Sequence, residues 1–433
     1  MKYRFIIISL FFALFGSVQA QTTISFEQAL SLTLENNYDI LMAEVNEEIA
    51  VNSATKSNNG FLPTVTTNGA YSWNYVAGEN KLRTETISFD PNNSYNYNAT
   101  ALVNYTLFDG QGRKYNYLQA KGNLKLSELQ LQQTIQNTII ELARIYFEVA
   151  RLEESVVALY TLVDISKERF LRAKYRYEYG QAKKLDVLNA KVDLNTDSIS
   201  LITTLQNLKN LKRDLNFIMG QEISQDLVIS NEVEIHRDYI REEVQLAAEE
   251  NNLQLKLAEN NLALNEYAIG ASQSNWLPRL GANAGYQYGG TDNPNGAFLI
   301  GSNNFGPQAG LSLSWTLFDG RNNTQIKNAK LNLKNSQIGQ QSLKQSIKSQ
   351  ALNAYDTYQN LLFVLSAQAD NVTTAKDNFD RSESSYDLGQ ISSVEFRQAQ
   401  LNLLNAEQAL SKARYDAKNA EFQLLAVMGG LVE

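Results

Sequence analysis

Two segments in each half of the chain alternate between apolar and polar residues. Over residues 94–108, one set of alternate positions is apolar throughout: Tyr95, Tyr97, Ala99, Ala101, Val103, Tyr105 and Leu107. The positions between them are mostly polar, with Asn96, Asn98, Thr100 and Asn104. A period of two predicts β-strands with one apolar and one polar face. The same pattern predicts three more strands, over 62–76, 279–289 and 305–318.

A sheet with one apolar face has two possible environments. A soluble sheet would pack that face on a core, whereas a membrane barrel would turn it to lipid and keep the polar face in water. Aromatic residues near the strand ends favour the barrel, because aromatic girdles mark membrane interfaces. They are Trp73, Tyr75, Tyr95 and Tyr97. We expect the polar connections 77–93 and 290–304 to be long external loops.

The period changes from two to 3.5 after each pair of strands. Apolar residues recur at spacings of four and three from Leu131 to Tyr177, and again from Ile347 to Tyr386. A sustained 3.5-residue repeat predicts coiled-coil helices. Glycine ends each long helix near 180 and 389, and a second helical pattern follows. We therefore expect helical hairpins over 111–219 and 321–429.

The same elements occur twice in the same order. The sequence TLFDG occupies 106–110 and 316–320, Leu62-Pro63 recurs as Leu277-Pro278, and Met219-Gly220 recurs as Met428-Gly429. These collinear matches predict two copies of one unit, residues 21–220 and 240–433, with a linker over 221–239. Each unit is a short helix (27–57 in the first copy), two strands, a very long helix and a medium helix.

Each TLFDG copy lies where the strand pattern gives way to the helix pattern. Asp109 and Asp319 are placed to cap the first turn of the following helix. Gly110 and Gly320 would let the backbone bend at the joint. We interpret both strand-to-helix joints as architectural, neither catalytic nor metal-binding.

Composition narrows the function. A charged start, a short apolar run and small residues before Gln21 have the pattern of a secretory signal peptide over 1–20. The chain has 433 residues, a formal net charge of −8, one histidine and no cysteine. An acidic chain binds nucleic acid poorly. The shortage of reactive groups argues against an enzyme, a metal site or a bound cofactor.

Four strands are too few for a membrane barrel, whose minimum is about eight. Two chains would supply eight strands and three would supply twelve. Because larger barrels hold an aqueous channel, a transport function favours three or more chains.

In this order of elements, with its Leu-Pro strand starts, Asp-Gly strand exits and two hairpin turns, the mature chain resembles the TolC-like outer-membrane efflux proteins. The resemblance implies an α+β membrane protein that forms a homotrimer. Each chain would give four strands to a 12-stranded β-barrel in the lipid of the outer membrane. Long coiled-coil helices would form a tunnel in the periplasm.

The resemblance also implies a passive, gated channel without a cofactor. Drugs or other cargo would reach it from a periplasmic adaptor (membrane fusion) protein and an inner-membrane pump of RND, ABC or MFS type, as in tripartite efflux or type I secretion. The helix-tip turns at Gly180-Gln181 and Gly389-Gln390 match the family's tip motif and would contact the adaptor.

The resemblance implies that four residues of this chain occupy the positions of the family's gate. Asp186 matches an acid that bonds a tyrosine on the neighbouring hairpin and holds the tips closed, and Tyr386 matches that tyrosine. Glu395 matches one acid of a cation-sensitive ring at the pore mouth, while the second acid falls on Gln398, so the ring would carry fewer charges. The alternative for Asp186 and Glu395 is capping, because an acid in the first turn of a helix favourably meets the helix dipole.

The competing interpretation of the whole chain is an exported coiled-coil scaffold without a pore. It explains the 3.5-residue seams and leaves the two strand pairs with aromatic ends unexplained.

Overall fold

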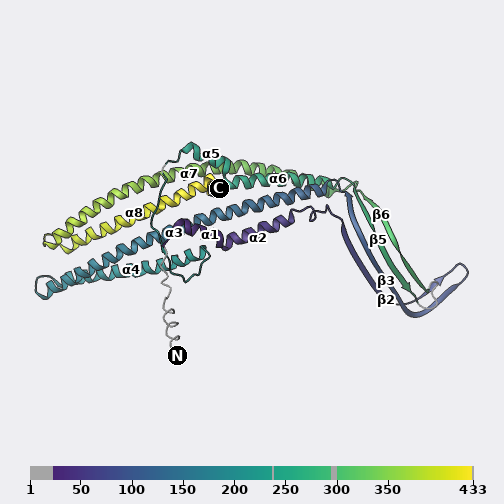
Figure 1. Cartoon of the computed structure of the whole chain (residues 1–433), viewed down its shortest axis with the longest axis horizontal. Helices are drawn as coiled ribbons and strands as arrows, with labels where there is room; N and C mark the ends of the chain where they lie inside the picture. The colour runs from purple at the N-terminus through teal and green to yellow at the C-terminus, as the bar shows by residue number, and fades with distance from the viewer. Residues whose placement is uncertain (1–22, 237, 294–299, 432–433) are drawn as a thin grey trace, which may run out of the picture. The chain divides into compact units, whose positions relative to one another are not determined.

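The computed structural model describes residues 23–236, 238–293 and 300–431 (Figure 1). They divide into two compact units, each built from both halves of the chain. The bundle unit comprises residues up to 45, 129–256 and from 342 onward, and the sheet unit comprises 46–128 and 257–341. The signal peptide predicted over 1–20 lies outside the described residues.

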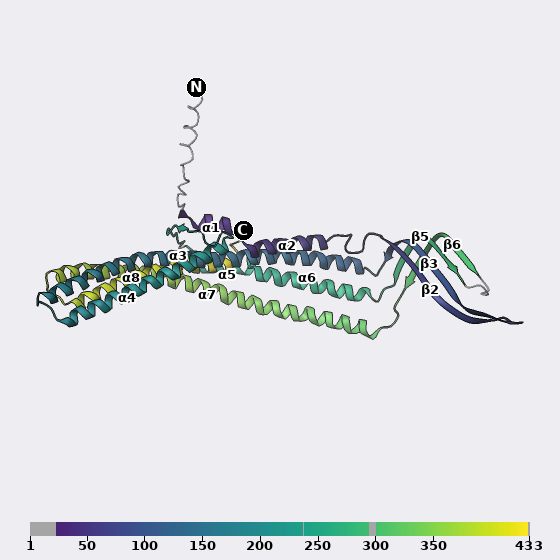
Figure 2. The ribbon, with the colours of Figure 1, turned by 90° about the horizontal axis from the view of Figure 1, so that it is seen from below.

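The sheet unit contains one antiparallel, four-stranded sheet. Its strands lie side by side in the order β2 (Thr64–Lys81), β3 (Thr86–Phe108), β5 (Arg279–Asp292) and β6 (Gly301–Ser314) (Figure 2). Both β2 and β5 begin directly after a Leu-Pro dipeptide. In sequence order, each half of the chain therefore supplies one hairpin of the sheet.

Strand pairing puts the apolar rows on one face. Directly opposed residues share a face of the sheet, and one such row runs through Val65, Val103, Ala284 and Ala309. The neighbouring row, through Thr64, Asn104, Asn283 and Gly310, lies on the opposite face. We call these the apolar face and the polar face. Among the described residues nothing covers the apolar face, where Val65 is 71% exposed and Leu311 is 75% exposed.

The first expected loop, 77–93, is instead mostly strand. β2 and β3 continue past a register shift between Val76 and Gly78, and they pair until Lys81 meets Thr86. Backbone pairing does not require an apolar side chain, so the polar sequence of this stretch does not end the hairpin. In the second connection, β5 and β6 pair until Asp292 meets Gly301, and residues 294–299 lie outside the described residues.

The last expected strand, 305–318, ends early, at Ser314. Ser314 pairs with Arg279, which is the first residue of β5, so no partner backbone is available beyond it. The alternating pattern continues through Trp315 and Leu317, but Trp315 instead donates its indole N–H to the carbonyl oxygen of Trp276 at 3.0 Å.

The 3.5-residue pattern corresponds to four long helices in two hairpins. They are α3 (Gly112–Glu178), α4 (Lys184–Ile218), α7 (Gly320–Asp387) and α8 (Ser393–Met428). None of the helices in the described residues is both long and apolar enough to cross a lipid bilayer.

The single helix expected over 27–57 is two helices, α1 (Phe26–Asn36) and α2 (Tyr38–Ser53). The break is at Asn37, whose backbone is extended (φ −68°, ψ 127°). Its side-chain oxygen accepts from the Asp39 N–H at 3.0 Å, and its amide donates to the Ile218 carbonyl at 2.9 Å. The side chain therefore caps α2 and ties the break to the end of α4.

The second half repeats this arrangement between α5 (Arg241–Asn251) and α6 (Leu253–Ser274). Asn252 accepts from the Gln254 N–H at 3.0 Å and donates to the Val427 carbonyl at 3.0 Å, near the end of α8. In each half, one asparagine thus caps the following helix and donates a hydrogen bond to a carbonyl near the end of a hairpin.

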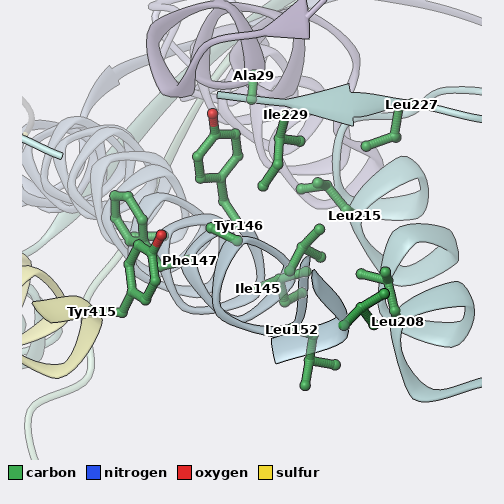
Figure 3. Close-up of a cluster of buried hydrophobic side chains, with 14 of the residues drawn as sticks. Ala29, Ile145, Tyr146, Phe147, Leu152, Leu208, Leu215, Leu227, Ile229 and Tyr415 are labelled. Atoms are coloured by element: carbon green, nitrogen blue, oxygen red, sulfur yellow. The ribbon is translucent and has the colours of Figure 1, made fainter. Parts of the chain in front are cut away.

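A large hydrophobic cluster of the bundle unit forms around the middle of α3 (Figure 3). Tyr146 and Phe147 are almost fully buried there, and Phe147 stacks on Tyr415 of α8 with 5.9 Å between ring centroids. The Tyr146 hydroxyl lies 2.9 Å from the carbonyl oxygen of Ile24 and 3.0 Å from that of Ser230. It therefore ties α3 to a two-stranded parallel sheet of β1 (Thr23–Ile24) and β4 (Val228–Ile229).

Glycines at the two ends of the first hairpin provide a matched test of this packing. Gly220 and Gly180 both have left-handed φ angles, +64° and +72°, so a side chain at either costs about 1–2 kcal/mol in backbone strain. A Cβ at Gly220 would lie 2.3 Å from the Asn36 carbonyl oxygen, whereas nothing lies within 4 Å at Gly180. We expect Gly220→Ala to lower the thermal unfolding midpoint of the purified protein more than Gly180→Ala.

The second half supplies an independent repeat of the comparison. A Cβ at Gly429 would lie 2.5 Å from the Asn251 carbonyl oxygen, and Gly389 has open space. Equal losses of stability within both pairs of variants would contradict the contact between the hairpin ends and the helix breaks.

Candidate functional site

The two helix tips share one turn geometry. Gly180 and Gly389 are left-handed, at φ +72° and +75°. The Gln181 N–H donates to the Arg176 carbonyl at 2.7 Å, and the Gln390 N–H donates to the Ser385 carbonyl at 2.8 Å. Each bond runs from an N–H to the carbonyl five residues earlier, as in a Schellman motif. Such a motif ends a helix by providing a donor for a carbonyl that has no partner within the helix. Both turns are exposed, so their surface is available to a partner.

The acids after the turns cap the helices that they begin. Asp186 accepts from the Lys183 N–H at 3.1 Å. Glu395 accepts from the Ser392 N–H at 2.7 Å, while the Ser392 hydroxyl accepts from the Glu395 N–H at 3.3 Å, which completes a capping box. The Ser392 backbone N–H, and then the Ser392 side chain, lower the pKa of the Glu395 carboxyl. Within one chain, both carboxylates therefore cap the helix that they begin, as the alternative to a gate role predicts.

Tyr386 lies in a different setting from Asp186. Its ring stacks on Phe396 with 4.7 Å between centroids and 11° between planes, and the Arg172 guanidinium lies 5.2 Å from its centroid. Within the part of the chain that the structure describes, no hydrogen bond joins Tyr386 to Asp186. Gln398 donates to Asn402 of its own helix at 2.8 Å. The four predicted gate residues are thus near the tips but are not brought together within one chain.

A buried polar cluster near the tips was not predicted from the sequence. We call it the tip cluster, and its members come from α3, α4 and α8: Ser166, Arg169, Asp193, Asp197, Ser393, Arg397 and Gln400. Arg397 donates to both oxygens of Asp197, at 2.8 Å and 2.6 Å, and the Ser166 hydroxyl donates to Asp197 at 2.5 Å. Asp197 is only 3% exposed, so its charge depends on these partners.

Arg169 forms the second half of the tip cluster and is 4% exposed. It donates to Asp193 at 3.2 Å, to the Ser393 carbonyl at 3.1 Å, to the Ser393 hydroxyl at 2.9 Å and to Gln400 at 3.3 Å. Burial lowers the pKa of the Arg169 guanidinium, and the charge of Asp193 opposes that change. Because α3 and α4 form the first hairpin and α8 belongs to the second, the cluster links the two hairpins of one chain.

The sequence offered one sign of this cluster. Ser166 occupies an apolar position of the 3.5-residue seam, and a polar residue in such a position needs a partner inside the bundle. The partners themselves come from segments up to 231 residues away, and they look like ordinary charges on helix surfaces.

The two strand-to-helix joints are built differently. At the first, Gly110 and Gln111 are both left-handed, at φ +67° and +69°. The Gly112 N–H closes that turn onto the Asp109 carbonyl at 3.2 Å, and the Asp109 carboxylate accepts from the Arg113 N–H at 2.7 Å.

At the second joint, Asp319 accepts from the Arg321 N–H at 2.9 Å, but Gly320 is already the first residue of α7. Gly320 has no left-handed φ, so the left-handed turn seen at Gly110 has no counterpart at this residue. The early end of β6 explains the difference, because residues 315–319 give the chain room to turn. Within the described residues, no group of three or more histidine or acidic side chains could hold a metal ion.

The sequence matches a known family over most of its length. The family model described as "Outer membrane efflux protein" matches residues 29–221 and 246–430. The chain is 24% identical over 407 residues to "Outer membrane protein TolC" of Vibrio cholerae, covering 92% of this chain and 89% of that protein. It is 25% identical over 358 residues to the protein of the same name from Escherichia coli, covering 79% and 71%.

Solved structures of the same fold cover 94% of this chain. The CmeC outer membrane channel of Campylobacter jejuni matches with a TM-score of 0.78 at 17% identity, over 85% of its own length. The open state of the MtrE outer membrane channel of Neisseria gonorrhoeae matches with a TM-score of 0.71 at 19% identity, over 89% of its length.

These matches do not support a scaffold protein without a channel. The family model covers both hairpins and both strand pairs. The chain belongs to the outer membrane efflux protein family.

Proposed function

We propose that three copies of this chain form a 12-stranded barrel in the outer membrane, continued by a helical tunnel in the periplasm. The observation that carries this proposal is the sheet itself. It has an uncovered apolar face and, within the described residues, two edges, β2 and β6, with no partner strand. Joining β6 of one copy to β2 of the next removes every edge, and lipid covers the apolar face.

Exposed apolar stripes on the helices support contacts between copies. One stripe on α2 contains Tyr38, Met42, Val45 and Ile49, which recur at helical spacing and are 56–60% exposed. In the second half, α6 covers α3 within the chain, where Asn260 donates to the Gly122 carbonyl at 2.9 Å. By the same arrangement, α2 of one copy would cover the exposed Leu331 and Ile338 of α7 in the next copy.

We also infer that residues 21–220 and 240–433 are two copies of one structural unit joined by 221–239. The matched asparagine bonds at Asn37 and Asn252 support this division, as do the four Schellman turns that end the long helices. Two similar units per chain would give the assembled wall six similar repeats around its axis.

In this proposal the assembly is a passive conduit for drugs or other cargo. A periplasmic adaptor and an inner-membrane pump of RND, ABC or MFS type would deliver the cargo and supply the energy. The exposed tip turns, Gly180-Gln181 and Gly389-Gln390, would contact the adaptor. The family description and the channel names of the structural relatives support this role.

We assign the gate to the helix tips. Asp186, Tyr386, Glu395 and Gln398 lie there, with Asp186 and Tyr386 available to bond between copies. Within one copy, the tip cluster joins the two hairpins more strongly than the exposed Arg172–Asp387 pair does, because the charges of the cluster are buried and paired. The cluster therefore sets how far α8 can move from the first hairpin when the channel opens.

Cell fractionation tests the assembly. We expect the protein in the outer membrane, soluble only with detergent, with the mass of three chains after correction for bound detergent. The reason is that the exposed apolar faces of both sheet and helices are covered only in that state. Recovery of a monomer from the periplasmic fraction without detergent would contradict the proposal.

Single-channel recording tests the gate. Asp197→Asn removes the closer of the two counter-charges of Arg397, at 2.6 Å, and leaves Asp193 at 3.9 Å. Breaking a buried ion pair costs up to about 3–5 kcal/mol, so we expect a higher resting conductance and greater antibiotic leak. Asp387→Asn is the matched control, because the Arg172–Asp387 pair also joins the hairpins, at 2.7 Å, but is about half exposed and worth about 1 kcal/mol or less.

An equal effect of the two substitutions would contradict the role of the tip cluster. Asp186→Asn in the same assay tests the inter-copy bond separately. Its conductance should also rise if Asp186 helps to close the tips, and an unchanged conductance would count against that role.

A further inference from the structure

The polar face of the sheet is almost free of charge. Between the strand-to-helix joints and the register shift at Val76, its paired rows consist of asparagine, glutamine, serine, threonine and glycine, with Ala70 and Leu102 as apolar members. Arg279, paired with Ser314 in the row nearest the helices, is the single ionisable residue of the polar face in this stretch of the described sheet. This neutrality contrasts with the formal net charge of −8 on the whole chain.

Arg279 is held in place without being neutralised. It is the first residue of β5, and its guanidinium donates to the Asn275 side chain at 3.0 Å. Its side chain is exposed, and no carboxylate lies within ion-pair distance of it in the described part of the chain. A single hydrogen bond to an amide fixes the position of the guanidinium and leaves most of its five donors free.

The guanidinium lines an open groove of about 550 Å³, and most of the other lining residues are polar. Hydroxyl and amide groups of Thr106, Asn116, Ser272 and Ser312 line it. The groove also contains Asp109, but that carboxylate accepts from the Arg113 N–H at 2.7 Å and lies 3.4 Å from Arg113 Nε. Since Asp109 and Arg113 offset one another, the uncompensated charge of the groove is that of Arg279.

We propose that Arg279 determines the charge selectivity of the barrel section, where it concentrates anions and repels cations. This inference rests on the proposed trimeric channel, in which three copies of Arg279 would form one ring at the base of the barrel. A fixed charge inside a water-filled passage with low-dielectric walls raises the local concentration of counter-ions. The neutral rows between the ring and the register shift at Val76 add no opposing charge.

The chemistry of the group indicates which solutes the ring holds best. A guanidinium binds carboxylate or phosphate oxygens through paired N–H donors. Anions that carry several such groups are therefore expected to dwell at the ring, and neutral polar solutes to pass it without delay. The attraction should be strong at low ionic strength, because the screening length falls from about 10 Å at 0.1 M salt to about 3 Å at 1 M.

Current block by tripolyphosphate in planar bilayers tests the proposal on the full chain. Added from the sheet side in 0.1 M KCl, it should reduce the current through the wild-type channel, and the block should weaken in 1 M KCl. Arg279→Gln, which can still bond Asn275, should raise the blocking concentration roughly tenfold. Arg279→Glu should abolish the block. In a KCl gradient it should also shift the reversal potential toward the equilibrium potential of K⁺.

Arg321→Gln is the control, because it removes the same charge from an arginine whose side chain is 90% exposed, at the second joint. It should be blocked like the wild type. If Arg279→Gln conducts but is blocked at the wild-type concentration, the role of Arg279 is overturned while the channel stands. If the wild-type protein carries no current at all, the channel is overturned, and with it this role.

Discussion

The unpaired edges and uncovered face of the four-stranded sheet constrain every other part of this molecule. Backbone groups at the edges of β2 and β6 have no partner strand in the described chain, and apolar residues such as Leu311 and Leu313 are more than 70% exposed. Bare edges template uncontrolled association, and a one-sided sheet loses the hydrophobic contribution of its apolar face unless something apolar covers it. In the proposed assembly, closure with further copies inside a membrane meets both requirements.

Local hydrogen bonds and buried ion pairs end the helices and hold them together in a chain without disulfides. Left-handed glycines at 180, 220, 389 and 429 close the carbonyl ends of all four long helices. Asn37 and Asn252 break the shorter helices and bond the ends of α4 and α8. Near the tips, Arg169 and Arg397 join the hairpins through buried charges. Buried ion pairs are weak evidence for stability but costly to break, so they hold the two hairpins of one chain together at this level.

The sequence predicted the features that depend on periodicity and failed on those that depend on distant partners. Alternation placed the strands, and the register of β2 to β6 puts the predicted rows on a single face. The end of β6 could not be read from its own residues, because it is set by where β5 begins, at Arg279. The helix break at Asn37 was missed because its reason, the Ile218 carbonyl, lies 181 residues away. The same holds for the tip cluster, whose members look like solvated charges until α3, α4 and α8 pack together. For Asp186 and Glu395, the rule that acids cap the first turn of a helix describes the bonds within one chain. The carried-over gate acts between copies and stays a prediction.

Cryo-electron microscopy of the full chain in lipid nanodiscs tests the central claim most directly. The account predicts three copies around one axis and a closed barrel in which β6 of each copy pairs with β2 of the next. The row through Val65 and Val103 should lie against the lipid belt, and the row through Thr64 and Asn104 should face the water-filled interior. A particle with an open sheet edge, or with the apolar face packed against protein in place of lipid, would contradict it.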